Sequence, residues 1–144
     1  MKFLKNNALY LSWTTALASM LGSLYFSNVL NFPPCVLCWY QRITMYPLVA
    51  ILGVGILRKD KNVSYYVLPL SLIGLGIAAY HNLLYYKIIP ESLAPCVAGV
   101  SCTTKFIEYF GFVTIPFLSF LGFLAISILM FIHLRGSKET NQTI

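Results

Sequence analysis

Four long apolar stretches make up most of the 144 residues, and they constrain the fold more than any other feature of the chain. They cover about residues 8–30, 39–57, 63–84 and 112–134. A helix of about 20 apolar residues crosses a hydrocarbon core about 30 Å thick. Only 10% of the residues are charged, against about 25% in soluble domains. The sequence therefore predicts an all-α, polytopic membrane four-helix bundle, with residues 1–144 as a single integral membrane domain.

The first stretch also has features of a secretory signal peptide. Lys2 and Lys5 precede the apolar run, and the Ala-Leu-Ala at 16–18 resembles a cleavage site. Cleavage there would leave residues 19–30, which are mostly apolar, with no helix to complete. We therefore expect this stretch to be retained as a membrane-spanning helix.

The positions of the basic residues indicate how the bundle is oriented. Most of them fall in the N-terminus, the connection between the second and third stretches, and the C-terminus: Lys2, Lys5, Arg58, Lys59, Lys61, Arg135 and Lys138. In a four-span chain these segments share one side, and the positive-inside rule makes that side cytoplasmic. Both termini are thus predicted to be cytoplasmic. Membrane orientation accounts for the net charge of +6, so we expect no nucleic-acid partner.

The two remaining connections, about residues 31–38 and 85–111, are predicted to face outward, and they contain all four cysteines. Cys35 and Cys38 form a CXXC pair, and Cys96 and Cys102 are separated by five residues. Disulfides form and persist outside the cytoplasm, whereas reducing systems oppose them inside it. Two cysteine pairs on the oxidising side are typical of a redox circuit. A CXXC pair at a membrane surface can pass two electrons between a soluble dithiol and an acceptor dissolved in the bilayer.

Arg42 distinguishes the two members of the CXXC pair. If the second helix begins near Cys38, its unsatisfied amides and its dipole favour a thiolate there, so we expect Cys38 to have the lower pKa. Arg42 follows one helical turn later on the same face, where a cation would favour that thiolate and stabilise negative charge on a reduced acceptor. The alternative is a boundary arginine that extends to the lipid headgroups.

His81 lies near the outer end of the third stretch. A titratable residue within a span is a functional candidate because its burial is costly. If the acceptor dissolved in the bilayer is a quinone, its reduction to a quinol consumes two protons. His81 could then deliver a proton or donate a hydrogen bond to an oxygen of the quinone ring. The alternative is a solvated interfacial histidine. His133, at the cytoplasmic end of the fourth stretch, is expected to be a boundary residue.

Other uses of the cysteines agree less well with the sequence. A c-type haem needs CXXCH, and Trp39 occupies the position of the histidine. The spacings and the oxidising compartment disfavour a zinc site built from all four cysteines, so we expect no metal. Cys96 and Cys102 could close a static structural disulfide. A loop with no helix of its own around the pair favours exchange with a partner protein instead.

The longer outward connection contains aromatic residues at helical spacing. Phe106, Tyr109 and Phe110 fall at positions i, i+3 and i+4. This spacing predicts a short helix over residues 104–110 that lies in the membrane interface and leads into the fourth stretch. The alternative is that the fourth membrane helix simply starts early.

The chain resembles the DsbB/BdbC family of membrane disulfide oxidoreductases over nearly its whole length. The resemblance rests on the run PCVLCWYQR at 34–42, the loop from Pro95 and Cys96 to Cys102, and the four-helix layout. The short spacing of the second cysteine pair is similar to the BdbC branch, found in Gram-positive bacteria. The predicted catalytic residues are Cys35, Cys38, Cys96 and Cys102, and the predicted cofactor-binding residues are Arg42 and His81.

The resemblance implies an electron donor and an electron acceptor. The donor would be a thioredoxin-fold oxidase of the DsbA/BdbD kind, and the acceptor a membrane quinone, menaquinone or ubiquinone, so that the protein supports disulfide formation in secreted proteins. We expect the reduced partner to attack Cys96 of a Cys96–Cys102 disulfide, after which Cys102 attacks Cys35. Cys38 then leaves as a thiolate beside Arg42 and donates to the quinone.

Two alternative functions remain open from the sequence. One is a quinone reductase of the vitamin K epoxide reductase type, which also uses CXXC in a four-helix bundle. The other is a structural membrane protein whose cysteines form inert disulfides.

Overall fold

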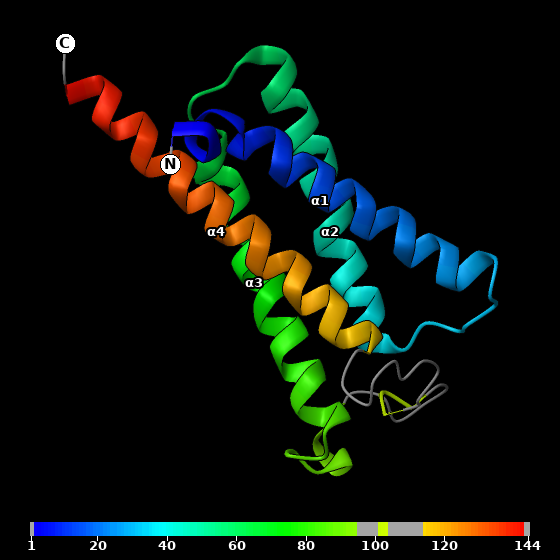
Figure 1. The fold of residues 1–144 in the computed structure, drawn as a ribbon. Coiled ribbons are helices and arrows are strands. Elements are labelled where there is room, and N and C mark those ends of the chain that lie inside the picture. Colours follow the sequence, from blue (N-terminus) through cyan, green and yellow to red (C-terminus); the bar gives the residue numbers. More distant parts are fainter. Residues whose placement is uncertain (1, 95–100, 104–113, 143–144) are drawn as a thin grey trace.

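The computed structural model describes residues 2–94, 101–103 and 114–142. These residues form four α-helices and one short 3₁₀ helix, with no strand among them: α1 (Lys2–Asn28), α2 (Val36–Arg58), α3 (Val63–Tyr85), η1 (Glu91–Leu93) and α4 (Ile115–Gln142) (Figure 1). The predicted all-α class is thus confirmed. The predicted helix over residues 104–110 lies outside the described residues.

The four long helices pack in a ring that follows their order in the chain. Each helix packs mainly against two neighbours, through the pairs α1–α2, α2–α3, α3–α4 and α1–α4. Both chain termini and the short connection between α2 and α3 lie toward one end of the bundle (Figure 1). The connection between α1 and α2 and the segment after α3 lie toward the other end, which we call the loop end.

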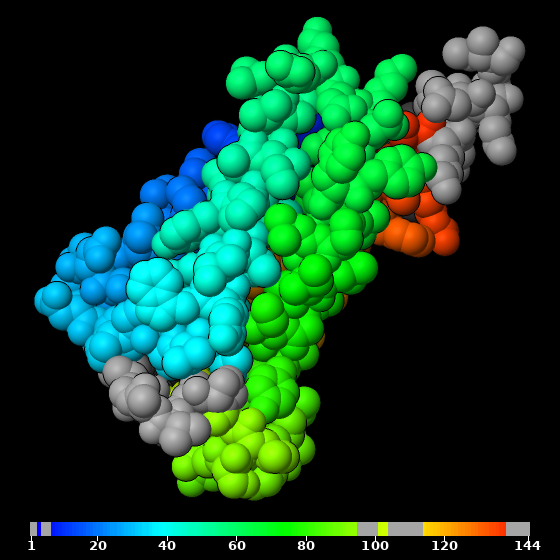
Figure 2. Space-filling model, turned by 180° about the vertical axis from the view of Figure 1, so that it is seen from behind, coloured from blue at the N-terminus to red at the C-terminus, as the bar shows by residue number. Residues whose placement is uncertain are grey.

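Three of the helices are long and apolar enough to cross a membrane: α2, α3 and the part of α4 over Ile115–Ser137. This finding supports a multi-pass membrane protein. At 27 residues α1 also has the length for a crossing. That α1 spans the membrane stays a prediction. Figure 2 shows α2 and α3 side by side along one face of the bundle. Large apolar side chains are exposed on these two helices, among them Ile43, Val54, Leu72 and Ile73, as expected of a surface that contacts lipid.

The connection between α2 and α3 is a tight helical hairpin. Lys59 ends α2 in the left-handed conformation, with φ 52° and ψ 40°. The N–H groups of Lys59 and Asp60 donate to the carbonyls of Ile56 and Gly55 and so satisfy the last turn of the helix. The Asp60 side chain then accepts a hydrogen bond from the backbone N–H of Asn62 at 2.8 Å. The helices α2 and α3 therefore form an antiparallel hairpin.

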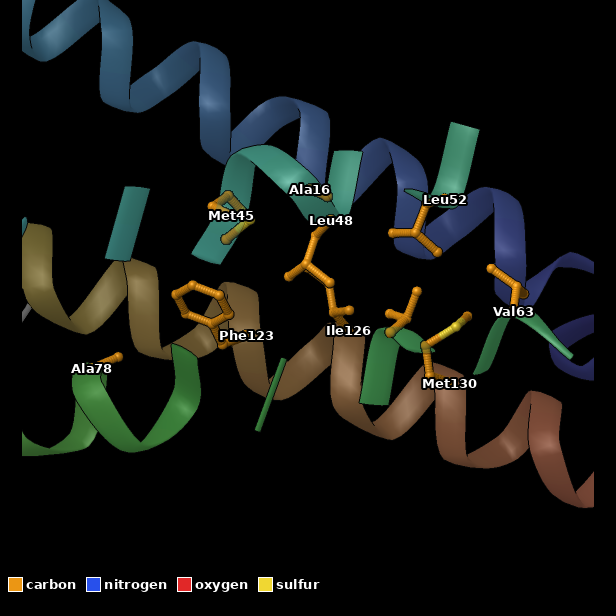
Figure 3. Close-up of a cluster of buried hydrophobic side chains, with 10 residues drawn as sticks. Ala16, Met45, Leu48, Leu52, Val63, Ala78, Phe123, Ile126 and Met130 are labelled. Carbon is orange, nitrogen blue, oxygen red and sulfur yellow. The ribbon is translucent and has the colours of Figure 1, made fainter. Parts of the chain in front are cut away.

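A cluster of buried apolar side chains forms the core between the four helices (Figure 3). It contains residues from all four helices: Ala16, Met45, Leu48, Leu52, Val63, Val67, Ala78, Phe123, Ile126 and Met130. The ring of Phe123 in α4 packs directly on Gly74 of α3, where a Cβ atom would overlap it. Gly76, two residues further along α3, has nothing within 4 Å of such an added atom. The close approach of α3 and α4 therefore depends on Gly74.

Candidate redox site

At the loop end the bundle encloses a cavity of about 350 Å³. Residues from α1, α2, α3 and α4, from the segment before α2, and from the described residues 101–102 line it. Most of the wall is apolar, but several polar and sulfur-containing side chains reach it: Cys35, Cys38, Gln41, Arg42, His81 and Cys102. Five of the six predicted site residues therefore share one cavity. The sixth, Cys96, lies outside the described residues.

The start of α2 positions the CXXC pair. Pro33 and Pro34 cannot donate backbone hydrogen bonds and keep the preceding chain extended, so the helix begins directly after them. Its first residue is Val36, and Cys35 is the N-cap. The Cys35 sulfur accepts a hydrogen bond from the backbone N–H of Cys38 at 3.4 Å. The helix thus begins two residues before Cys38, and its cap is Cys35 instead of Cys38.

Cys35 and Cys38 are free thiols whose sulfur atoms lie 3.0 Å apart. Hydrogen bonding from the Cys38 thiol is the largest of the effects that lower the pKa of Cys35 from 9.0 to about 4. Burial opposes this shift, while His81 and the backbone N–H of Cys38 reinforce it. The predicted assignment of the lower pKa to Cys38 is therefore wrong, since Cys35 occupies the helix cap and receives these interactions.

His81 of α3 is a buried member of the site, with 2% of its surface exposed. Its Nδ1 lies 3.2 Å from Nε2 of Gln41 in α2. Its Nε2 lies 3.8 Å from the sulfur of Cys35 and 3.3 Å from the backbone oxygen of Cys102. The Gln41 atom nearest Nδ1 is the amide nitrogen, which donates. A neutral His81 that accepts this hydrogen bond at Nδ1 carries its proton on Nε2. The N–H then faces the sulfur of Cys35 and the cavity.

Arg42 is held against the cavity by α1. Its Nε donates to the Ser23 hydroxyl at 2.9 Å, and one of its terminal nitrogens donates to the Ser23 carbonyl at 3.0 Å. The guanidinium also lies 5.4 Å from the centre of the Trp39 ring, within the range of a cation–π contact. The side chain is therefore fixed at the wall of the cavity.

Cys102 is disulfide-bonded and buried. It packs in a small cluster with Cys35, Leu37 and Leu84, so that a cysteine of the outer segment lies beside the N-terminal cysteine of the CXXC pair. The hydroxyl of the next residue, Thr103, donates to the Glu91 carboxylate of η1. This contact ties the segment that carries Cys102 to the segment after α3.

Sequence reasoning assigned no role to Gln41 or Ser23. Gln41 lies inside the run on which the family resemblance rests, and it is buried although its side chain is an amide. A buried amide within a membrane helix needs a partner, because an unsatisfied polar group is costly there. That rule could have singled out Gln41. Its pairing with His81 depends on how α2 and α3 pack together.

Comparisons with known proteins show which family the chain belongs to. The family model of the disulfide bond formation protein DsbB matches residues 5–133. Disulfide bond formation protein C of Bacillus subtilis is 52% identical over 75% of this chain and 78% of its own length. A probable disulfide formation protein C of Halalkalibacterium halodurans is 52% identical over 73% of this chain and 77% of its own.

A third relative, probable disulfide formation protein C 2 of Bacillus anthracis, is 48% identical over 81% of this chain and 82% of its own length. No solved structure gives a significant match. The family model covers far more than half of the chain, including Cys35, Cys38, Arg42, His81 and Cys102. The chain therefore belongs to the DsbB family of disulfide bond formation proteins, with the role of a membrane thiol:disulfide oxidoreductase.

Proposed function

We propose that the protein reoxidises an extracytoplasmic thioredoxin-fold oxidase of the DsbA/BdbD kind and passes the electrons to a membrane quinone. The observation that carries this proposal is the single cavity that holds the free CXXC pair together with Arg42 and the buried His81. The distribution of basic residues orients the loop end of the bundle, with its cysteines, toward the extracytoplasmic side. There a soluble dithiol protein can reach the outer segment while the cavity remains next to the bilayer.

The cavity fits a flat, apolar ring with polar substituents. Its volume of about 350 Å³ falls within the range of about 300–1,000 Å³ that is usual for small-molecule sites. Aromatic side chains contribute much of the apolar wall: Phe26, Phe32, Tyr46, Tyr85 and Phe123. When bound, a quinone supplies an acceptor for two electrons and two protons. The guanidinium of Arg42 is a permanent cation that favours negative charge beside it, and the N–H of His81 is a hydrogen-bond donor.

The relay from the outer segment to the CXXC pair is two successive thiol–disulfide exchanges. The partner dithiol reduces the Cys96–Cys102 disulfide and becomes oxidised. The released Cys102 thiolate attacks the sulfur of Cys35 in a Cys35–Cys38 disulfide, and Cys38 leaves as a thiolate. Cys96 then displaces Cys35, which restores the outer disulfide and leaves Cys35 and Cys38 reduced. The packing of Cys102 against Cys35 supports this order.

Gln41 is a positioning residue in this proposal. Its amide holds Nδ1 of His81, so that the opposite nitrogen, Nε2, faces Cys35 and the cavity. A rotated imidazole ring, or a ring with its proton on Nδ1, would lose the hydrogen bond from the Gln41 amide. The amide would then be buried without a partner, which is unfavourable. Gln41 therefore fixes which nitrogen of His81 can donate toward the cavity.

The direct test is oxidation of a reduced thioredoxin-fold partner by the purified protein in lipid nanodiscs. We expect turnover only when a menaquinone or ubiquinone analogue is added, with one quinol formed for each partner disulfide. A Cys38→Ser protein should lose this activity. Partner oxidation that is unaffected by Cys38→Ser, or that proceeds without quinone, would overturn the proposal. The same assay separates the alternatives, because inert disulfides give no turnover and an epoxide reductase prefers its epoxide.

The direction of the relay has a separate test. A partner with only its attacking cysteine is added to a Cys35→Ser/Cys38→Ser protein, in which only the outer cysteine pair remains. Its thiolate should open the Cys96–Cys102 disulfide and stay as a mixed disulfide on Cys96, with Cys102 released as a thiol. Peptide mapping by mass spectrometry identifies the cysteine that holds the partner. A mixed disulfide on Cys102, with Cys96 released, would reverse the assignment.

A further inference from the structure

We propose that the reduced Cys35–Cys38 pair and His81 form a three-ligand site for a thiophilic divalent cation of the Zn²⁺ and Cd²⁺ class, open to the cavity on its fourth side. The sulfur atoms of the two cysteines and a ring nitrogen of His81 all lie within 4.8 Å of one another. Two thiolates and one imidazole with an open position form a donor set that such cations bind. Only the reduced protein offers this site, because a Cys35–Cys38 disulfide removes both thiolates.

The geometry needs little adjustment for a tetrahedral ion. Ordinary zinc–ligand bond lengths place two sulfur ligands about 3.8 Å apart, and a sulfur and a nitrogen ligand about 3.5 Å apart. The two sulfurs lie 3.0 Å apart, and the Cys35 sulfur lies 3.8 Å from Nε2 of His81. The sulfurs therefore need to separate by less than about 1 Å. The Cys38 sulfur and the ring nitrogen of His81 lie within 4.8 Å of each other, so they need to approach by no more than about 1.3 Å, within the reach of side-chain rotation.

The surroundings of the three ligands also suit a bound cation. A metal at Nε2 requires the proton of His81 on Nδ1, and the Gln41 amide can then accept from Nδ1–H through its oxygen after a flip. Such a partner on the second ring nitrogen is typical of metal-ligating histidines. The two thiolates balance the charge of the ion.

A cation bound in this way would act as an inhibitor of the reduced protein. With both thiolates coordinated, neither sulfur is free to transfer electrons or to reform the disulfide. This inhibitory effect rests on the proposed function, whereas the binding itself does not. Binding can therefore be measured without any oxidase assay.

The binding test uses the full chain in nanodiscs, in a Cys96→Ser/Cys102→Ser background that leaves only the CXXC thiols. The reduced protein is titrated with Cd²⁺ under anaerobic conditions, and the thiolate-to-cadmium absorption band is followed. We expect one equivalent to bind to the reduced protein and none to the oxidised protein. Equal binding by both forms would overturn the proposal.

Variants of the two histidines test the third ligand. In the same background we expect His81→Ala to weaken Cd²⁺ binding by about tenfold or more, and Gln41→Leu to weaken it by about tenfold. His133→Ala is the matched control, because His133 lies in α4 beside Ser64, away from the cysteines, and it should leave the affinity unchanged. Equal affinities of the His81→Ala and His133→Ala proteins would remove His81 from the site.

A spectroscopic measurement covers the case in which His81→Ala fails to fold. X-ray absorption of the Zn²⁺-loaded, reduced protein should show two sulfur ligands and at least one imidazole nitrogen. A shell of two sulfurs without imidazole would overturn the proposed ligand set. Inhibition is read separately as Zn²⁺-dependent loss of partner oxidation, so an inactive preparation that still binds one Cd²⁺ contradicts the proposed function and leaves the metal site supported.

Discussion

The two histidines of the chain lie toward opposite ends of the bundle, and their surroundings differ. His81 is almost completely buried and is surrounded by Gln41, the sulfur of Cys35 and the backbone oxygen of Cys102. His133, in the half near the termini, is only partly buried, and its Nδ1 lies 2.8 Å from the hydroxyl of Ser64. The presence of a histidine in a helix of this bundle therefore does not by itself indicate a reactive site. His81 and His133 differ in the groups that the neighbouring helices place beside them.

The same contrast extends to the packing of the helices. In the half near the termini, apolar side chains from α2, α3 and α4 fill the interior, among them Leu52, Val67 and Met130. At the loop end, the same helices enclose a cavity and direct thiols, an amide, a guanidinium and an imidazole toward it. We infer that the packed half provides rigidity and that the loop end provides the reactive groups. The following predictions test this division.

The largest expected effect concerns the titration of Cys35. In the reduced protein the rate of alkylation at Cys35 should be half-maximal well below the ordinary value of 9.0, because the hydrogen bonds at the helix cap lower the pKa of Cys35. The thiolate persists above that midpoint and is lost as the pH falls through it. A Cys38→Ala change removes the largest cause of the lowered pKa and should move the midpoint upward. Mass spectrometry of the Cys35 peptide over a pH series measures both, and a midpoint above pH 8 in the unmodified chain would contradict the assignment.

Replacement of each histidine compares the two ends directly. His81→Asn should lower quinone-dependent turnover by about 100-fold, as expected when a positioned proton donor is lost. His133→Asn should leave turnover within about twofold, a difference of less than about 0.5 kcal/mol. Steady-state oxidation of the reduced partner measures both variants. Equal losses of turnover in the His81→Asn and His133→Asn variants would show that His81 has no special role in the reaction.

The two arginines that contact aromatic rings form a similar matched pair. Arg42 lies against Trp39 at the cavity, and Arg135 lies 4.5 Å from the centre of the Phe131 ring in α4. Loss of a hydrogen bond to a charged group costs about 1.5–3 kcal/mol, so Arg42→Met should raise the KM for quinone by roughly 10-fold to 100-fold. Arg135→Met should not change it. The KM values at saturating partner concentration provide the test.

Two glycines of α3 test the packed half. Gly74→Ala places a Cβ atom in the ring of Phe123, and such overpacking should lower the free energy of unfolding by about 1–3 kcal/mol. Gly76→Ala meets no atom within 4 Å and should be neutral or slightly stabilising. Thermal unfolding in nanodiscs measures the difference. Equal melting temperatures for the two variants would show that the contact between α3 and α4 is looser than described.

Much of the fold was predictable because the membrane limits the choices. Stretches of about 20 apolar residues can satisfy their backbone polar groups in lipid only as helices or closed barrels. The cap of α2 was less predictable, because whether Cys35 or Cys38 caps the helix depends on the backbone conformation after Pro34. That local detail also moved the lowered pKa from the expected Cys38 to Cys35.

The sequence by itself determined the helical membrane class, the family and the CXXC pair, since these depend on composition and on spacing along the chain. The tertiary structure alone decided that Gln41 of α2 meets His81 of α3, that Ser23 of α1 holds Arg42, and that Cys102 lies beside Cys35. These contacts depend on how each helix is rotated and packed against its neighbours. In a membrane helix the side that faces lipid and the side that faces the core are both apolar, so the sequence of one helix does not show how that helix is rotated. The CXXC pair is thus visible in the sequence, whereas its reactive surroundings arise only from the packing of four helices.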